Sequence, residues 1–292
     1  MDTSNHRITP AALEHLRDWV GREETVDDDL SAAPVRGMAA MLDLAKVPGA
    51  RGEALRPLWH WLYFLPRAPQ AELGDDGHPR LGGFLPPVPL PRRMWAGGRL
   101  EWLAPLHVGD VVRRSSRIAS VAHKAGRSGD LVFVTVRHEV SRDGEVALTE
   151  EQDIVYRAAA QPGDPVPVAQ PAPTDAVWSC DIRPDPVLLF RYSALTFNGH
   201  RIHYDRDYAT GVEGYPGLVV HGPLIATLLC ELAVQQRPDA RLRRFAFKAV
   251  RPTFDTSPLR VCGKPSADGQ SAQLWAQDHE GALTMQADVQ FA

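Results

Sequence analysis

The sequence predicts an α+β protein made of two tandem units, each an antiparallel sheet wrapped around a central helix. Three observations predict it: two sets of strand-like runs, a proline-rich segment between them, and a long apolar helical pattern in the second set. The strand-like runs alternate apolar and polar side chains, as in Val132, Val134 and Val136, and turns such as Asp143-Gly144 separate them. The repeated layout indicates two domains of similar kind.

We expect the first domain over residues 1–157 and the second over residues 177–292. Residues 158–176 contain five prolines among Ala, Gln and Asp, a composition typical of an extended linker. The predicted strands lie at 111–121, 131–141 and 145–157 in the first domain, and from Arg241 and at 259–264, 272–277 and 283–291 in the second.

The strongest helical pattern runs from Gly222 to Gln236, where leucines and an isoleucine recur at helical spacing and form one wide apolar stripe. At about 1.5 Å per residue this helix is roughly 22 Å long, enough to lie across a curved sheet. A sheet wrapped around one such helix is the hot-dog arrangement. In the first domain, residues 38–45 and 55–64 also have helical spacing, although prolines interrupt it.

Composition excludes several classes of function. The chain has 292 residues and a net charge of −4, so it offers no broad positive field to nucleic acid. Its three cysteines are odd in number and widely separated, which predicts neither a disulfide framework nor a thiolate zinc site and favours a reducing cytosol. The most apolar stretch, 217–234, is broken by polar residues and a proline. We therefore expect a soluble cytoplasmic protein without membrane partners.

A candidate active site lies in the second domain, within residues 195–205. Asn198 and His203 stand five positions apart on a polar segment, where an amide and an imidazole can hold and activate a water molecule. Gly222 opens the apolar helix, so its backbone N–H faces incoming negative charge. Adding water to an α,β-unsaturated thioester requires both features. The plainer alternatives are that Asn198 caps a turn and that Gly222 is only a helix entrance.

Three segments resemble known enzymes. Residues 195–205 resemble the signature of MaoC-like hydratases and dehydratases, which contains Asp, any residue, and Asn-Pro-Leu-His. Residues 59–66 and 82–98 are similar to 3-methylfumaryl-CoA (mesaconyl-CoA) hydratases and to mitochondrial hydroxyacyl-thioester dehydratases. The resemblance implies a double hot-dog fold and reversible hydration of an acyl-CoA thioester, with 3-methylfumaryl-CoA and citramalyl-CoA as the expected pair. It implies no cofactor, and by family analogy a homodimer.

One position departs from the MaoC-like signature. His203 matches its histidine, but Asn198 occupies the place of its aspartate and His200 that of its asparagine. An amide cannot take a proton near neutral pH. Either His203 handles both proton transfers, or another acid completes the pair, and the candidates are Glu150, Glu151 and Asp153.

Several cationic and aromatic side chains are candidates for substrate binding. The free carboxylate of a dicarboxylic acyl-CoA needs a cation, which Arg92, Arg93 or Arg99 would supply. The phosphates of CoA are assigned to Lys248 and Arg251, or to Arg244. His221 either binds substrate or braces the helix start. The candidates for the cavity wall are Trp59, Trp61 and Trp95.

We expect no metal, because no carboxylate or cysteine in the sequence clearly completes a set with His200, His203 and His221. The first domain has no Asn/His copy, so we expect it to be non-catalytic and to widen the acyl pocket, with one site per chain at the seam.

Three alternative functions stay open. A fatty-acid type of 3-hydroxyacyl-thioester dehydratase would use the same residues. A hot-dog thioesterase commonly needs an acid early on the central helix, where the only acid is Glu231, more than two turns in. A non-catalytic acyl-thioester binding module would keep the tunnel and lose the water site.

Overall fold

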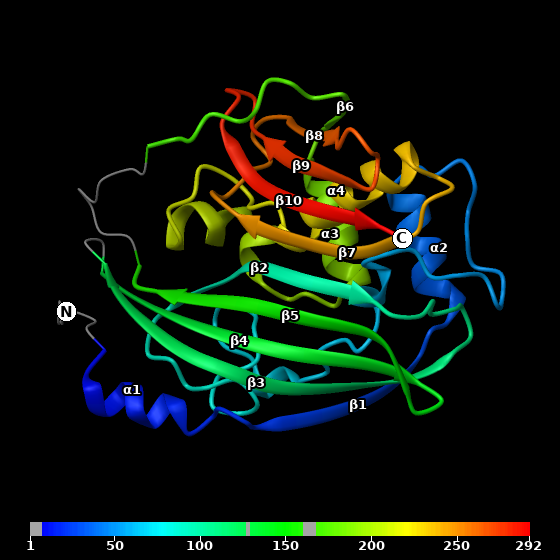
Figure 1. The fold of residues 1–292 in the computed structure, drawn as a ribbon. Coiled ribbons are helices and arrows are strands. Elements are labelled where there is room, and N and C mark those ends of the chain that lie inside the picture. The colour runs from blue at the N-terminus through cyan, green and yellow to red at the C-terminus, as the bar shows by residue number, and fades with distance from the viewer. Residues whose placement is uncertain (1–7, 127–128, 160–167) are drawn as a thin grey trace.

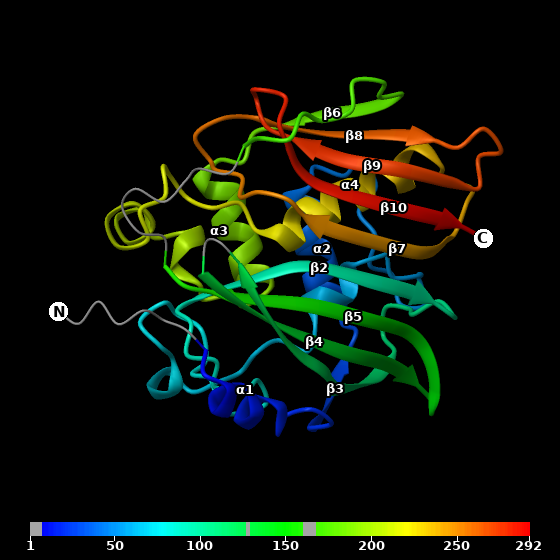
Figure 2. The ribbon, with the colours of Figure 1, turned by 60° about the vertical axis from the view of Figure 1, so that its left-hand side comes forward.

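The computed structural model describes residues 8–126, 129–159 and 168–292, and in these the chain forms one antiparallel sheet with helices packed on one face (Figures 1 and 2). The described sheet has ten strands in the order β1-β3-β4-β5-β2-β7-β10-β9-β8-β6, so each half of the chain contributes five. The strands are β1 (Glu23–Asp29), β2 (Arg92–Trp102), β3 (Val111–Gly126), β4 (Gly129–Arg142), β5 (Glu145–Arg157), β6 (Trp178–Ile182), β7 (Leu242–Ala249), β8 (Leu259–Pro265), β9 (Ser271–Gln277) and β10 (Leu283–Phe291). The two halves repeat one strand order, which confirms the tandem α+β prediction.

Helix α4 (Gly222–Gln236) is the central helix of the second half and has the bounds that the sequence predicts. It packs against every strand from β6 to β10, and ten consecutive residues from Leu224 to Ala233 are buried. The other helices are α1 (Pro10–Arg17), α2 (Ala32–Met41) and α3 (Pro186–Leu195), and the short helical turns are η1 (Trp59–Leu62), η2 (Gln70–Glu72), η3 (Arg201–His203) and η4 (Tyr208–Val212).

The first half covers its sheet differently. Two helical segments were expected there. In place of 38–45 the structure has α2, which begins and ends closer to the N-terminus, and in place of 55–64 it has only the single turn η1. Residues 81–90 instead lie on β3, β4 and β5, where Val88 and Leu90 pack with Val132, Val134 and other buried side chains. Prolines at 86, 87 and 89 prevent a helix in this segment but permit an extended path.

The two halves join where β2 pairs with β7. The register places Gly97 opposite Lys248 and Glu101 opposite Arg244. A Cβ on Gly97 would lie 2.6 Å from the Phe247 carbonyl oxygen, and one on Gly98 would lie 2.8 Å from the Phe247 ring. The two glycines therefore let the halves approach closely enough to make one sheet.

A β-bulge at residue 96 changes which face the side chains of β2 occupy. Before it, Arg93 pairs with Tyr156; after it, Arg99 pairs with Glu151. Opposed residues of an antiparallel pair share a face, and Tyr156 and Glu151 lie on opposite faces of β5 because they are an odd number of residues apart. Arg93 therefore faces the helices, and Arg99 faces solvent.

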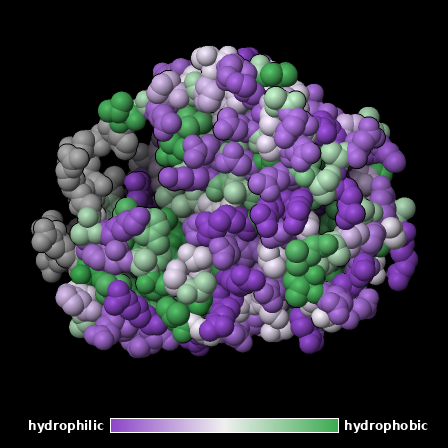
Figure 3. All heavy atoms as spheres, viewed as in Figure 1, coloured by the Kyte–Doolittle hydropathy of each residue, from purple (hydrophilic) through white to green (hydrophobic). Residues whose placement is uncertain are grey.

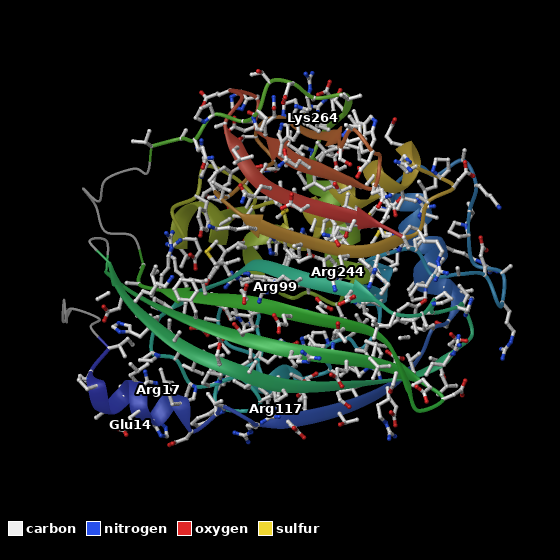
Figure 4. All side chains as sticks on the ribbon, in the orientation of Figure 1. Glu14, Arg17, Arg99, Arg117, Arg244 and Lys264 are labelled. Carbon is white, nitrogen blue, oxygen red and sulfur yellow. The ribbon has the colours of Figure 1, made fainter. Side chains whose placement is uncertain are left out.

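The face of the sheet away from the helices is polar. Figure 3 shows hydrophilic side chains spread across its middle, and Figure 4 shows Arg99 and Arg244 on the two strands of the seam. The main core lies on the other face and joins both halves, with Trp59, Leu224 and Phe245 among its fully buried side chains. No helix in the described parts of the chain is both long and apolar enough to cross a membrane.

The proline-rich segment falls partly outside the described residues, since 160–167 are not among them. From residue 168 to β6 the chain makes an isolated bridge, Pro171 to Ala282, without a helix or strand. The domain boundaries at 157 and 177 stay predictions.

Candidate active site

The imidazole of His203 lies at the start of α4 and is 8% exposed. Its Nδ1 is 2.7 Å from the Val219 carbonyl oxygen, which can only accept a hydrogen bond, so Nδ1 carries the proton and Nε2 has the free lone pair. Its ring stacks on His221 with centroids 3.7 Å apart. Burial lowers the pKa of His203 to about 4, despite the opposing hydrogen bond to Val219. His203 is therefore neutral at physiological pH and can accept a proton at Nε2.

Three further histidines form a row with His203. The ring centroid of His200 is 5.3 Å from that of His203 and 4.1 Å from that of His78 in the first half. Burial, together with His78, lowers the pKa of His200 to about 2. His221, the N-cap residue of α4, is fully buried with Nε2 2.8 Å from the Ser193 hydroxyl, and burial lowers its pKa well below the ordinary value. His221 thus packs against His203 at the helix start, and contact between His221 and a substrate stays a prediction.

A carboxylate from the first half adjoins this row. One Asp76 oxygen is 2.9 Å from His78 Nδ1, and the other accepts the His78 backbone N–H at 3.0 Å. Burial opposes the charge on Asp76, but the hydrogen bonds and charge of His78 outweigh it and hold the pKa of Asp76 well below its usual range. Sequence reasoning missed this pair. The signal available was an Asp-Gly turn followed directly by a histidine, just before the recognised segment 82–98.

Two glycines allow the loops that carry these groups to touch. A Cβ on Gly77 would collide with the Gly199 carbonyl, and one on Gly199 would lie 2.8 Å from the Gly77 oxygen. The Arg201 backbone N–H donates to the Asp76 carbonyl at 2.9 Å, and its guanidinium donates to the Asp75 carbonyl at 3.1 Å. Backbone contacts therefore fix the position of Asp76 and His78 relative to η3.

Gly222 lies beside the seam between the two halves. Gly222 is the first residue of α4, where an α-helix leaves N–H groups without intrahelical acceptors. A Cβ there would lie 3.6 Å from the Trp95 carbonyl oxygen, so β2 passes directly in front of the helix start. Trp95 and Trp61 have ring centroids 4.9 Å apart beside this point, whereas Trp59 is fully buried in the core.

A cavity of about 470 Å³ opens next to the histidine row, and its lining includes Asp76, His78, Arg93 and Tyr156. Arg93 forms no ion pair with a described carboxylate, and its positive charge acts to lower the pKa of both His78 and His200. The fully buried Tyr156 hydroxyl, on the cross-strand neighbour of Arg93, lacks a hydrogen-bond partner of ordinary geometry among the described residues. The cavity thus offers an anion a guanidinium that has no carboxylate partner among the described residues, with the Tyr156 hydroxyl beside it.

The other cations predicted for substrate binding lie elsewhere. Arg92 pairs with Glu213 at 2.9 Å, and Arg99 pairs with Glu151 and Asp153 on the outer face. Strand alternation also directs Lys248 and Arg244 outward, while Phe245 and Phe247 point inward. Arg251 lies 3.3 Å from Asp278. Of these predicted residues only Arg93 lines the cavity, and substrate binding by Arg92, Arg99, Lys248 and Arg251 stays a prediction.

The Asn198 side chain stabilises a turn, which is the plainer of the two roles that the sequence allows. Its side-chain oxygen accepts the His200 backbone N–H at 3.0 Å, which stabilises the turn before η3. Contact between Asn198 and a catalytic water stays a prediction.

The acids weighed as relay partners are held away from the row. Glu151 and Asp153 face outward, and Glu150 is buried with His60 and Trp61 each 2.9 Å from its oxygens. Burial opposes ionisation of Glu150, but the hydrogen bond and charge of His60 outweigh it and lower its pKa to about 2.

Glu231, the acid on α4, is also engaged. It accepts hydrogen bonds from the Arg56 guanidinium at 3.0 Å and from the Trp59 indole at 2.8 Å. Both donors come from the first half. Glu231 therefore ties the two halves together, and it is not available as the base of a thioesterase.

A metal would need a convergent ligand set. His203 and His221 stack with an angle of 18° between their planes, so with His200 they do not form the set weighed from the sequence. In the described residues, Asp76, His78 and His200 bring one oxygen or nitrogen each within 4.8 Å of one another. The direct Asp76–His78 hydrogen bond already pairs the carboxylate with a proton donor, which is the geometry of an acid–base pair.

A sheet of two five-stranded halves, with a buried neutral imidazole against the start of the central helix, defines a double hot-dog protein. The chain belongs to the hydroxyacyl-thioester dehydratase type 2 family, which it matches over residues 58–255. A mesaconyl-C(4)-CoA hydratase of Chloroflexus aurantiacus is 48% identical over 275 residues, covering 93% of this chain and 96% of that protein. A mitochondrial hydroxyacyl-thioester dehydratase type 2 of Schizosaccharomyces pombe is 29% identical, covering 80% of this chain and 88% of that protein.

Solved structures show the same fold at low sequence identity. A MaoC-like dehydratase superposes with a TM-score of 0.68 at 17% identity, covering 96% of this chain and all of that one. HtdX of Mycobacterium tuberculosis superposes with a TM-score of 0.66 at 19% identity, covering 93% of this chain and all of that one. The double hot-dog prediction is confirmed.

Proposed function

We propose that this protein catalyses the reversible hydration of 3-methylfumaryl-CoA to citramalyl-CoA. The observation that carries the proposal is the neutral imidazole of His203, in a row of histidines beside a cavity whose arginine has no carboxylate partner among the described residues. The 48% identity to a protein named as a mesaconyl-C(4)-CoA hydratase supports this choice over a fatty-acid type of substrate.

His203 is the proposed general base for water. Its Nε2 accepts a proton as the water oxygen attacks the β-carbon, and the negative charge that develops moves onto the thioester oxygen. The Gly222 N–H, at the positive end of α4, stabilises that enolate; losing one such donor typically costs about 3 kcal/mol. Elimination of water follows the reverse path.

Arg93 is the proposed partner of the substrate's free carboxylate. In a 3-methylfumaryl thioester this carboxylate is attached to the β-carbon that water attacks. The cation that binds the carboxylate must therefore lie close to the residues that transfer protons. Arg93 and Tyr156 lie close to the histidine row, since they share the cavity lining with His78, whose ring centroid is 4.1 Å from that of His200. A monocarboxylic enoyl thioester would leave the half-buried guanidinium without an anion.

The test compares 3-methylfumaryl-CoA with crotonyl-CoA while following both loss of the enoyl absorbance and release of thiol. We expect loss of absorbance without thiol release, and a kcat/KM at least about 100-fold higher for the dicarboxylic substrate. Equal rates for both substrates would favour the fatty-acid type of dehydratase. Stoichiometric thiol release would indicate a thioesterase, and binding without either signal would indicate a binding module.

Location and assembly are proposals of the same kind. A reducing compartment such as the cytosol agrees with three free thiols, Cys180, Cys230 and Cys262. A homodimer rests on family analogy and is tested by sedimentation of the purified chain.

A further inference from the structure

His78 differs from the other three histidines of the row in two respects. It lines the cavity, whereas the other three do not, and His203 and His221 are buried. It is also the member of the described row whose ring nitrogen meets a carboxylate, because His203 Nδ1 meets a backbone carbonyl and His221 Nε2 meets a serine hydroxyl. A carboxylate behind an imidazole orients it and stabilises its protonated form.

We propose that His78, held by Asp76, is the second proton-transfer group of the site and replaces the carboxylate that is missing at Asn198. The inference rests on the proposed hydration and assigns the group that serves the α-carbon. The aspartate that the second half lacks is thus supplied from the first half, at the cavity surface, through the contact of the Gly77 and Gly199 backbones. On this proposal the first half takes part in catalysis.

The proton transfers balance without a further reactant. In hydration, the water oxygen forms a bond to the β-carbon and its proton passes to Nε2 of neutral His203. The α-carbon of the resulting enolate takes a proton from the imidazolium of His78, which becomes neutral. The proton on His203 then returns to His78 by way of His200, whose ring adjoins both. The net change is the addition of one water. In dehydration, neutral His78 removes the α-hydrogen as a proton.

The charges around His78 fit a group that changes protonation during the cycle. The groups that face it are Asp76 on its own loop, Arg93 on β2 and His200 on the docked loop. Burial and the Arg93 charge lower the pKa of His78, and Asp76 opposes them. A substrate carboxylate bound to Arg93 would offset the guanidinium charge, which raises the pKa of His78 when substrate is present.

The experiment measures kcat and kcat/KM for hydration of 3-methylfumaryl-CoA between pH 5 and 9 in the full chain. His78→Gln should lower kcat by about 100-fold or more, the usual loss for a proton-transfer group. Because His78 must be protonated in hydration, the rate falls as pH rises through its pKa. Asp76→Asn removes the charge that raises this pKa, so the alkaline limb should move down by about one pH unit or more.

A second readout separates chemistry from structure. With citramalyl-CoA deuterated at the α-carbon, His78→Gln should increase the primary isotope effect on dehydration, because removal of the α-hydrogen becomes rate-limiting. The control is His107→Gln, since His107 is another histidine of the first half beside an aspartate, Asp110 at 3.6 Å, and does not line the cavity. It should retain the wild-type profile. Thermal melting shows whether each variant folds. If Asp76→Asn does not fold, the test depends on His78→Gln alone.

Three results would overturn the inference: a His78→Gln enzyme with a kcat within about threefold of the wild type, an alkaline limb unmoved in a folded Asp76→Asn enzyme, or loss of wild-type activity on chelation with recovery on adding Zn²⁺, which would make the cluster a metal site. The proposed function fails separately, if the wild type hydrates neither thioester.

Discussion

The ring of His203 stacks on the ring of His221 with 3.7 Å between centroids and 18° between planes. His221 is the N-cap residue of α4, so this contact places the base against the helix end that carries the Gly222 amide. The hydrogen bond from Nδ1 to Val219 prevents the ring from turning over. The stacked rings thus hold the proposed proton acceptor on η3 beside the proposed oxyanion donor on α4, an arrangement that suits preorganised catalysis.

His203→Ala should lower kcat by about 10²- to 10⁴-fold, the range for loss of a general base. The helix and sheet should persist, because α4 is held by its apolar contacts with β6–β10. Steady-state hydration kinetics measure the loss of kcat, and far-UV circular dichroism measures whether the helices and sheet persist. His279→Ala, at an exposed turn, is the matched control. A folded His203→Ala enzyme with most of its turnover would remove His203 from the mechanism.

Arg93→Gln should reduce kcat/KM for 3-methylfumaryl-CoA by about 100-fold and leave crotonyl-CoA almost unchanged, because only the first substrate has a carboxylate to pair. Arg93→Lys should recover part of the loss. Arg99→Gln is the control, since Arg99 lies on the same strand but faces solvent with Glu151 and Asp153. An equal loss with both substrates would show that Arg93 acts on stability or on the thioester rather than on the carboxylate.

Gly77→Ala should disrupt the docking of the Asp76–His78 loop, because its Cβ would collide with the Gly199 carbonyl. Gly52→Ala gives the matched comparison: its φ of +81° resembles the +88° of Gly77, but no atom lies within 4 Å of the added Cβ. Backbone strain alone costs about 1 kcal/mol at such positions. Gly77→Ala should lose both more stability and more activity than Gly52→Ala. Similar behaviour of the two variants would mean that the loop contact is dispensable.

Glu231→Gln should destabilise the protein without removing its chemistry. The substitution leaves Arg56 unpaired beside Trp59, and we expect a loss of about 2 kcal/mol, less than the 3–5 kcal/mol for a fully buried pair because Arg56 is 26% exposed. Denaturant unfolding measures the loss of stability, and the hydration assay measures whether the activity is retained. Loss of hydration in a folded Glu231→Gln enzyme would show that Glu231 takes part in the reaction as well as in stability.

Stability should fall as the pH is lowered from about 6.5 toward 4.5. The pKa values of His203 and His138 are lowered to about 4, and that of His200 to about 2, chiefly by burial, whereas the unfolded chain binds these protons near pH 6.5. In this window the unfolded state holds more protons, so the unfolding free energy decreases with falling pH, by about 1.4 kcal/mol per unit for each such histidine. Chemical denaturation at several pH values tests the slope. His138→Gln should reduce it, and a pH-independent free energy would show that these rings are protonated when folded.

Much of this architecture could be predicted from local pattern. The strands at 145–157 and 283–291 and the helix at 222–236 agree with the structure. An apolar residue at every second position predicts a strand and one at about every 3.6 positions predicts a helix, and neighbouring residues show this pattern. The strand β2 was not predicted: its sequence, Arg-Arg-Met-Trp-Ala-Gly-Gly-Arg-Leu-Glu-Trp, contains a bulge and two glycines that break the alternation. The first-half helices were misplaced because prolines and tertiary packing override a weak periodicity.

The sequence by itself determined the tandem sheets, the central helix, and the position of His203 and Gly222 near the start of that helix, since each depends on residues close together in the chain. Only the tertiary structure decided which arginine lines the cavity and which carboxylate lies beside the histidine row. One extra residue in β2 places Arg93 and Arg99 on opposite faces of the sheet. Contact between two glycines far apart in sequence brings Asp76 and His78 to His200. Such contacts depend on how closely two backbones can approach, and local sequence pattern does not encode that distance.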